Sequence, residues 1–308
     1  MYYNQITKQK VHISCALIDK CWGESPLKND YDRAKMTIYK TAGTDALLMH
    51  FHNEYEMIFI DAGSAVFTIN DMDTEYAENT LVFINKFERH MLFPRTKPYS
   101  RYVLIIDSSY FDKFMQDPVL CSIFKNRSGV FSNGLTLSKQ SAQVVTEILD
   151  LCIEEFTNKE PYWDSRIMAA LLNMFIHLYR HYSMCFPLTI NDYASENIAK
   201  IQNYIDSNYL SDLSLDSLSR VFNINKYHLA HVFKRVTGYS TKQYVLLNRI
   251  SHAKNLLHYT NKSIVQIAGE SGFNSASNFI RAFKSHEKTT PLNYRKEITR
   301  LKTSASFT

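Results

Sequence analysis

The chain has 308 residues, of which 45% are hydrophobic and 21% are charged, with 8 Gly and 7 Pro. This balance is typical of a globular protein and excludes largely disordered, collagen-like and low-complexity chains. No apolar stretch approaches the ~20 residues that cross a bilayer. The first residues also lack the apolar core and cleavage site of a signal peptide, so we expect a cytoplasmic protein with no membrane partner.

The net charge of +5 is distributed unevenly along the chain. Residues 191–308 contain 16 Lys and Arg against 8 Asp and Glu, whereas the remainder contains 19 against 22. A basic excess confined to one end is expected where one domain binds a polyanion and the other does not.

Residues 36–106 alternate apolar and polar side chains in short runs rich in β-branched and aromatic residues, at a spacing of 8–15 residues. Turn residues, such as Gly63-Ser64 and Asn70-Asp71, separate these runs. The pattern predicts an antiparallel β-barrel or sandwich over residues 1–108.

Residues 109–186 change to the helical period, with apolar stripes over 138–157 and 162–182. These stripes can be explained by packing of both helices on the β domain. We prefer to add a second role, contact with another subunit, so this segment is predicted to be a helical linker and dimerisation region of a homodimer.

The C-terminal third contains an internal duplication with a period of about 50 residues. Each copy predicts a short helix, a turn and a second helix: 213–222 followed by 226–235, then 263–271 followed by 275–284. These are the proportions of a helix-turn-helix, in which the second helix enters the DNA major groove. The competing interpretation is a helical bundle with no DNA partner, and the duplication weighs against it.

The outward faces of the two second helices bear hydrogen-bond donors and cations but no carboxylate, which suits double-stranded DNA. We predict base contacts from Tyr227, His228, His231, Asn278 and Arg281, and phosphate contacts from Lys226, Lys234, Arg235 and Lys284. The remaining predicted DNA-proximal residues include the candidate N-caps and are Asn225, Asn274, Ser275 and Ser277.

A single continuous helix is predicted over 240–259, between the two copies. Twenty residues at 1.5 Å each span ~30 Å. This length is close to the ~34 Å between successive major-groove faces on one side of B-DNA. The connector is therefore long enough for one chain to read two adjacent groove segments.

Residues 200–297 resemble the DNA-binding domain of the AraC/XylS family of transcription regulators. The motifs that carry the resemblance are Leu213 to Leu218, His228 to Gly238, Arg249, Ala253-Lys254, Ser263 to Ala268, Gly272-Phe273, Phe279-x-x-x-Phe283-Lys284 and Thr290-Pro291-x-x-Tyr294-Arg295. Thr241 and Lys288 stand where that family usually has Pro and Gly. The resemblance implies an AraC-type DNA-binding domain over 187–300, followed by a tail at 301–308.

His50, His52 and Glu56, followed by His90, resemble the metal-ligand motif of the cupin barrel, which is the usual sensory fold of AraC/XylS regulators. On one extended strand the first three side chains would share a face, unless a turn at 53–54 intervenes. The second cupin motif is degraded, with Glu78-Asn79 for Gly-Asp and Asn85 for Pro.

Three interpretations of this group stay open. Its members could bind a divalent metal, since imidazole and carboxylate suit Zn, Fe, Ni or Mn. They could instead line a polar pocket for a small effector such as a sugar, or be satisfied residues on a barrel rim. We favour the pocket, with no metal or other cofactor and no catalytic residue, and its predicted lining is His50, His52, Glu56, His90, Tyr55 and Tyr102.

The predicted fold class is α+β multidomain, with a cupin-like barrel, a helical middle segment and an all-α domain with two helix-turn-helix units. The predicted function is a sequence-specific transcription regulator, an activator, controlled by a small-molecule effector and partnered by RNA polymerase. The alternatives are a metal-dependent cupin enzyme with an appended DNA-binding module and a regulator with no effector. Only the first of these two alternatives is an enzyme.

Overall fold

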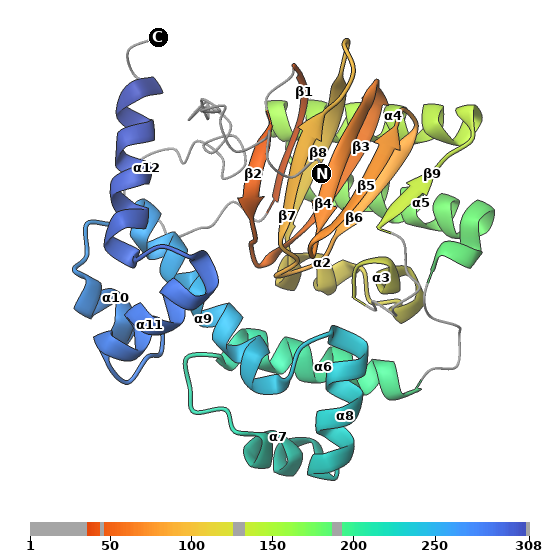
Figure 1. The fold of residues 1–308 in the computed structure, drawn as a ribbon. Coiled ribbons are helices and arrows are strands. Elements are labelled where there is room, and N and C mark those ends of the chain that lie inside the picture. The colour runs from red at the N-terminus through yellow and green to blue at the C-terminus, as the bar shows by residue number, and fades with distance from the viewer. Residues whose placement is uncertain (1–35, 44–45, 126–132, 187–192, 306–308) are drawn as a thin grey trace, which may run out of the picture.

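The computed structural model describes residues 36–43, 46–125, 133–186 and 193–305 (Figure 1). The N-terminal part is built from two antiparallel sheets with strand orders β1-β8-β3-β6-β9 and β2-β7-β4-β5. The strands are β1 (Met36–Ala42), β2 (Leu47–His50), β3 (Glu54–Ala62), β4 (Ser64–Ile69), β5 (Met72–Ala77), β6 (Thr80–Ile84), β7 (His90–Pro94), β8 (Ser100–Asp107) and β9 (Gly134–Thr136). The predicted barrel or sandwich is confirmed as two facing sheets that do not close fully.

The predicted turns join neighbouring strands. Asn70 and Asp71 both have positive φ, at 50° and 65°, and join β4 to β5. Two consecutive positive φ values are those of the two-residue hairpin turn that matches the right-handed twist of the strands, and Asn and Asp tolerate this conformation. This connection was predictable because its chemistry is local.

The alternation along β3 divides the domain into two cores. Ile58 and Ile60 pack between the sheets, whereas Met57 and Phe59 face the helices that cover the five-stranded sheet. These helices are α2 (Ser108–Phe114), α3 (Pro118–Lys125), α4 (Lys139–Asn158) and α5 (Trp163–Tyr182). In Figure 1, α4 and α5 lie behind the strands, and α2 and α3 lie below the lower ends of the strands. The described residues of 109–186 therefore share a core with the sheet, and packing on the β domain accounts for the apolar stripes of α4 and α5. The dimer seam stays a prediction.

The C-terminal part is entirely helical (Figure 1). A 3₁₀ turn, η2 (Ser183–Cys185), follows α5. The helices beyond it are α6 (Tyr193–Asn208), α7 (Leu215–Phe222), α8 (Lys226–Thr237), α9 (Thr241–Tyr259), α10 (Ile264–Glu270), α11 (Ala276–Glu287) and α12 (Pro291–Ala305). The predicted pair of helix-turn-helix units is confirmed as α7–α8 and α10–α11, at opposite ends of α9.

The connecting helix α9 is unbroken and is buried over most of its circumference. Ser240 caps it, accepting a hydrogen bond from the Gln243 backbone N–H, and the Gln243 side chain returns to the Ser240 backbone. A helix surrounded by packing needs no amphipathic stripe, because every face is an interior face. Here α9 is the core element that both helix-turn-helix units share.

The two domains share a hydrophobic cluster. Phe51 and Phe87, which precede β3 and β7, belong to the same buried cluster as Tyr244 and Leu247 of α9. The Tyr239 hydroxyl donates to the Phe87 carbonyl at 3.1 Å. The two sheets are therefore packed directly against the C-terminal helical part. Separately, no helix in the described ranges is long and apolar enough to cross a membrane.

Candidate functional site

The predicted DNA-contacting side chains all lie at the surface of the described structure. Tyr227 is 76% exposed, and the other members of the set on α8, on α11 and at their N-terminal ends are exposed as well. The opposite faces are buried: Leu229 and Phe233 on α8, Phe279 and Phe283 on α11. Each second helix thus packs on one side and offers donors on the other.

The N-cap residues fix how each recognition helix begins. The Asn225 side chain accepts from the backbone N–H groups of Tyr227 and His228, at 2.9 and 3.3 Å. Ser275, rather than Asn274, caps α11 by accepting from the Asn278 backbone N–H at 3.2 Å. A capped N-terminus directs the positive end of the helix dipole outward, which favours contact with phosphate.

Two contacts modify the predicted readers. Arg281 donates to the Asn278 side-chain oxygen at 2.7 Å, so these two neighbours on α11 hold each other in place. Lys226 lies 3.2 Å from Asp216, a carboxylate that α7 supplies. The outward faces of α8 and α11 themselves carry no carboxylate, as predicted, but the neighbouring helix α7 brings one to Lys226, the lysine that we predict to contact phosphate.

The four predicted histidine and glutamate side chains converge at one end of the barrel. His50 ends β2 directly opposite His90 of β7, and the chain turns before β3 begins at Glu54. The turn at residues 51–53 means that strand parity alone does not gather His50, His52 and Glu56. Even so, the group offers one ligand atom from each residue, and these atoms lie within 4.8 Å of one another. His50 is half-buried and the other three are buried.

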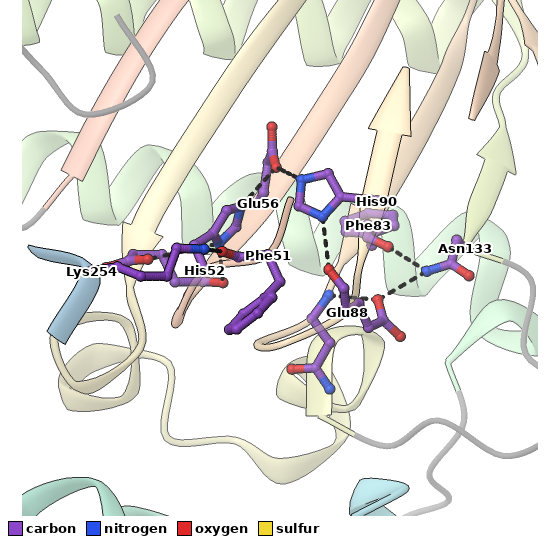
Figure 2. Close-up of polar contacts among 10 residues, drawn as sticks. Phe51, His52, Glu56, Phe83, Glu88, His90, Asn133 and Lys254 are labelled. Carbon is purple, nitrogen blue, oxygen red and sulfur yellow. Dashed lines mark hydrogen bonds and ion pairs between the residues drawn. The ribbon is translucent and has the colours of Figure 1, made fainter. Parts of the chain in front are cut away.

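Glu56 occupies the centre of this group (Figure 2). Its Oε2 lies 3.0 Å from Nε2 of His52 and 3.0 Å from Nε2 of His90. Burial raises the pKa of the Glu56 carboxyl, but the two imidazoles outweigh it and hold that pKa well below its usual range. Burial lowers the pKa of His52, and the contact with Glu56 reverses this and raises it.

The outer nitrogens of two imidazoles are held by the backbone. Nδ1 of His52 lies 3.1 Å from the Glu54 carbonyl, and Nδ1 of His90 lies 2.8 Å from the Glu88 carbonyl. A carbonyl oxygen only accepts, so both Nδ1 atoms carry the proton and donate it. Both Nε2 atoms are consequently turned toward the Glu56 carboxylate (Figure 2).

Tyr55 and Tyr102 are not brought to this group. They face the helix-covered side of the five-stranded sheet, in the other core. The Tyr55 ring stacks on Phe124 at 4.9 Å, and the Tyr102 hydroxyl donates to Asp150 at 2.8 Å. An odd position on β3 points away from Glu56 because strand side chains alternate.

A cavity of about 350 Å³ on this helix-covered side is lined by Phe59, Asp61, Glu78, Asn79, Lys139, Ala142, Gln143 and Thr146.

Sequence reasoning missed the residues that join the group to the DNA-binding domain. Lys254 of α9 donates to the Phe51 carbonyl at 2.9 Å and pairs with Glu287 at 3.1 Å. Lys86 forms a buried ion pair with Asp206 of α6. For Lys254 the available signal was a lysine on the apolar face of a predicted helix, since a buried ammonium needs a partner. Lys86 lies in a turn, where no such signal was available.

Comparison with known proteins supports this architecture. Residues 218–297 match the family described as a helix-turn-helix domain. The chain is 23% identical over 262 residues to the HTH-type transcriptional regulator YdeC of Bacillus subtilis, covering 80% of this chain and 86% of that protein. It is 32% identical over 129 residues to the regulator SAS0078 of Staphylococcus aureus, a match that spans 42% of this chain and 17% of that much longer protein.

Among solved structures, ToxT from Vibrio cholerae has the same fold. One ToxT structure superimposes with a TM-score of 0.55 at 19% identity, covering 84% of this chain and 97% of that one. ToxT bound to an unsaturated fatty acid matches with a TM-score of 0.52 at 18% identity, covering 84% and 94%. With its duplicated helix-turn-helix units on one connecting helix, the chain is similar to HTH-type transcriptional regulators, and its residues 218–297 match the helix-turn-helix domain family.

Proposed function

We propose that this chain binds a DNA site through α8 and α11, and that an effector bound at the barrel alters that binding. The observation that carries the proposal is the pair of exposed, capped recognition helices at the two ends of one unbroken helix. At 1.5 Å per residue, the 19 residues of α9 span about 28 Å. That length is close to the distance between two successive major-groove segments on one side of B-DNA.

The proposed effector site is the group of His50, His52, Glu56 and His90, which lies beside the domain interface. A structure of ToxT, which shares the fold, contains a bound unsaturated fatty acid, so a protein of this fold can bind a small organic ligand. An effector acts only if it binds two states of the protein with different affinity. The contact between barrel and α9 is the element whose geometry we propose to differ between those states.

Further assignments belong to this proposal. Residues 187–300 act as the DNA-binding domain, and residues 109–186 belong to the sensory domain. Two chains associate as a homodimer in the cytoplasm and present four recognition helices to paired half-sites. The bound dimer contacts RNA polymerase and activates transcription, and the chain itself catalyses no reaction.

The test is selection of DNA fragments from the source genome by the full chain, followed by footprinting on the recovered sequence. A regulator should protect two groove segments on one side of the duplex, with affinity that falls steeply as salt rises. A helical bundle without a DNA role would recover no common sequence, and that result would contradict the proposal.

A further inference from the structure

We propose that Phe51 and Phe87 of the barrel are positioning residues for DNA binding: each is connected to the C-terminal end of one recognition helix, so that the barrel sets the spacing at which α8 and α11 read two groove segments. The inference rests on the proposed function, because it concerns how the same two helices are held. It adds the residues through which the barrel acts and the property of the DNA site that they determine.

Phe87 contacts the residues that directly follow α8. One residue, Gly238, separates the end of α8 from Tyr239, whose hydroxyl donates to the Phe87 carbonyl at 3.1 Å. The Phe87 ring meets the Tyr239 ring edge-on, with 6.2 Å between centroids. It also meets the ring of Tyr244, near the start of α9, at 5.3 Å. A displacement of Phe87 therefore acts directly on the end of the first recognition helix.

Phe51 is connected to the end of α11 through Lys254 of α9. The Lys254 ammonium donates to the Phe51 carbonyl at 2.9 Å and lies 4.2 Å from the centroid of the Phe51 ring (Figure 2). The same ammonium pairs at 3.1 Å with Glu287, the last residue of α11, and the two side chains are only 5% and 11% exposed. An ammonium at this depth needs its partners, so a displacement of Phe51 also changes the position of the Glu287 carboxylate.

A second contact places the barrel beside the end of α11. Burial lowers the pKa of His286, which precedes Glu287, and the nearby charges that add to this effect include Arg89 of the barrel. Arg89 lies two residues after Phe87. The segment that contacts the end of α8 therefore also approaches the end of α11.

Phe51 and Phe87 are joined to each other. The Phe87 backbone N–H donates at 2.8 Å to the carbonyl of His52, the residue that follows Phe51. The two phenylalanine rings meet edge-on, with 6.5 Å between centroids. The turn that carries Phe87 is braced by Glu88, whose side chain accepts from the Asn85 backbone N–H at 2.8 Å. One movement of this edge of the barrel thus reaches both recognition helices.

The backbone of Phe87 supports a role beyond closing a turn. Its φ is 65°, in the left-handed region that a bulky residue rarely adopts. Such strain persists only where surrounding contacts fix the residue, and it is found where a side chain must hold one position. Here the contacts are those with Tyr239 and Tyr244.

The consequence for DNA binding is a fixed geometry between α8 and α11. When two linked units bind one molecule, the second contact is favoured only as far as the linkage holds that unit in place. The α9 helix sets the distance between the two units, and the contacts of Phe51 and Phe87 set the positions of the recognition-helix ends on either side of it. We expect the chain to accept a narrow range of spacings between its two groove segments.

The test uses the full chain and the DNA site recovered by genomic selection. Tyr239→Phe removes one hydroxyl and keeps the ring, and Phe51→Leu removes the aromatic face and keeps apolar burial. The combined variant is compared with Tyr162→Phe plus Phe93→Leu, the same two exchanges at positions that are 82% and 48% exposed. None of these four residues belongs to the predicted DNA-contacting set.

Binding is measured on the intact site, on sites with one groove segment scrambled, and on sites with the spacing changed by one base pair. In the unchanged chain and in the control, a one-base-pair change should weaken binding at least about 10-fold, because it rotates one segment by about 35° relative to the other. In the combined variant this penalty should fall at least about 3-fold, and affinity for the intact site should fall at least about 5-fold. Affinity for the single-segment sites should change less than about 2-fold, because each recognition helix binds its own segment as before.

Glu287→Gln weakens the connection at the end of α11 and is the second variant, which should lower the spacing penalty in the same way. Equal losses on the intact and single-segment sites would show that the two phenylalanines only support folding, and would overturn this inference. A spacing penalty unchanged in both variants would overturn it as well. Both results leave the proposed function standing, since they require a recovered DNA site. Recovery of no common sequence would overturn the proposed function, and this inference with it.

Discussion

The side chains on α11 differ in whether they can distinguish one DNA base from another. Arg281 and Asn278 are exposed neighbours joined by a hydrogen bond, and together they present the donors of the arginine and the amide of the asparagine. Both groups match base edges in the major groove, where arginine pairs with guanine and asparagine with adenine. Lys284, one turn further along, is a flexible point charge suited to phosphate.

Arg281→Ala should reduce discrimination at one base position by about 1–3 kcal/mol. The physical reason is loss of a directional donor pair from a helix whose position is otherwise unchanged. Competition binding against a library randomised at each position measures it. Lys284→Ala is the control: it should weaken binding to all sequences alike and lower the salt dependence. If Arg281→Ala behaved in the same way as Lys284→Ala, Arg281 would be a phosphate contact.

At this scale, local chemistry was readable and tertiary placement was not. Asn225 was identified as an N-cap because a cap needs only its own residue and the next three. Tyr55 was predicted to line the effector site on composition alone, yet the alternation of β3 turns it to the opposite side of the sheet from Glu56. The sheet on which a residue sits must be known before its face can be assigned.

The turn of the second helix-turn-helix is fixed by the element it touches. Gly272 has φ of +79°, and a Cβ there would lie 3.0 Å from Nε of Arg249 and 3.2 Å from the Leu210 backbone. Arg249 of α9 is itself anchored, donating from Nε to the Tyr209 carbonyl at 2.8 Å. The turn can therefore approach α9 only where no side chain intervenes.

Gly272→Ala should lower the free energy of unfolding by about 2 kcal/mol, because it combines a left-handed backbone with crowding against backbone atoms. Gly269 lies in α10, and a Cβ added there would meet open space. Gly269→Ala should therefore raise the free energy of unfolding by about 0.5–1 kcal/mol, because alanine has the higher helix propensity. Urea denaturation of both variants measures the difference. Equal effects would show that the close approach of the turn to α9 is unimportant.

The end of α11 carries a strained residue. Lys288 caps the helix with φ of 60°, where a non-glycine residue costs about 1–2 kcal/mol. Lys288→Gly removes this cost, but the greater freedom of glycine stabilises the unfolded chain by about 0.4–1 kcal/mol. We therefore expect the free energy of unfolding to rise by about 0.5–1 kcal/mol. Thermal unfolding measures it. Asn223→Gly, at the φ of 50° that ends α7, should change little, because Asn already tolerates this conformation.

Across the whole molecule, the barrel and the DNA-binding domain are held by a contact surface of mixed character. Phe51 and Phe87 supply apolar burial, Lys86 supplies a buried ion pair with Asp206 of α6, and Lys254 donates a hydrogen bond to the Phe51 carbonyl. Lys86 lies 5.3 Å from the ring centroid of Tyr244, so its charge is also stabilised by an aromatic face. Removing one partner of the buried Lys86–Asp206 pair would leave the other charge buried without a counter-ion, which is strongly destabilising.

Lys86→Met should lower the free energy of unfolding by about 3–5 kcal/mol, because it leaves the Asp206 carboxylate buried without its cation. Lys262→Met is the control, since its ion pair with Glu270 is largely exposed and should contribute less than about 1 kcal/mol. Calorimetry on the full chain gives both values. A loss for Lys86→Met no larger than the control's would mean that the two domains are not held together by this pair.

The sequence by itself determined the strand and helix pattern, the duplicated helix-turn-helix, the N-caps and the continuous α9, because each depends on residues close in the chain. It also identified the four members of the histidine and glutamate group, although these residues do not come together by sharing one face of a single strand. Only the tertiary structure decided that β2 and β7 bring His50 and His90 together, and that Tyr55 and Tyr102 face the other way. Only tertiary structure, too, placed Phe51 and Phe87 in the core of the DNA-binding domain. Contacts between residues far apart in the chain follow from the packing of whole elements, and no local pattern encodes them.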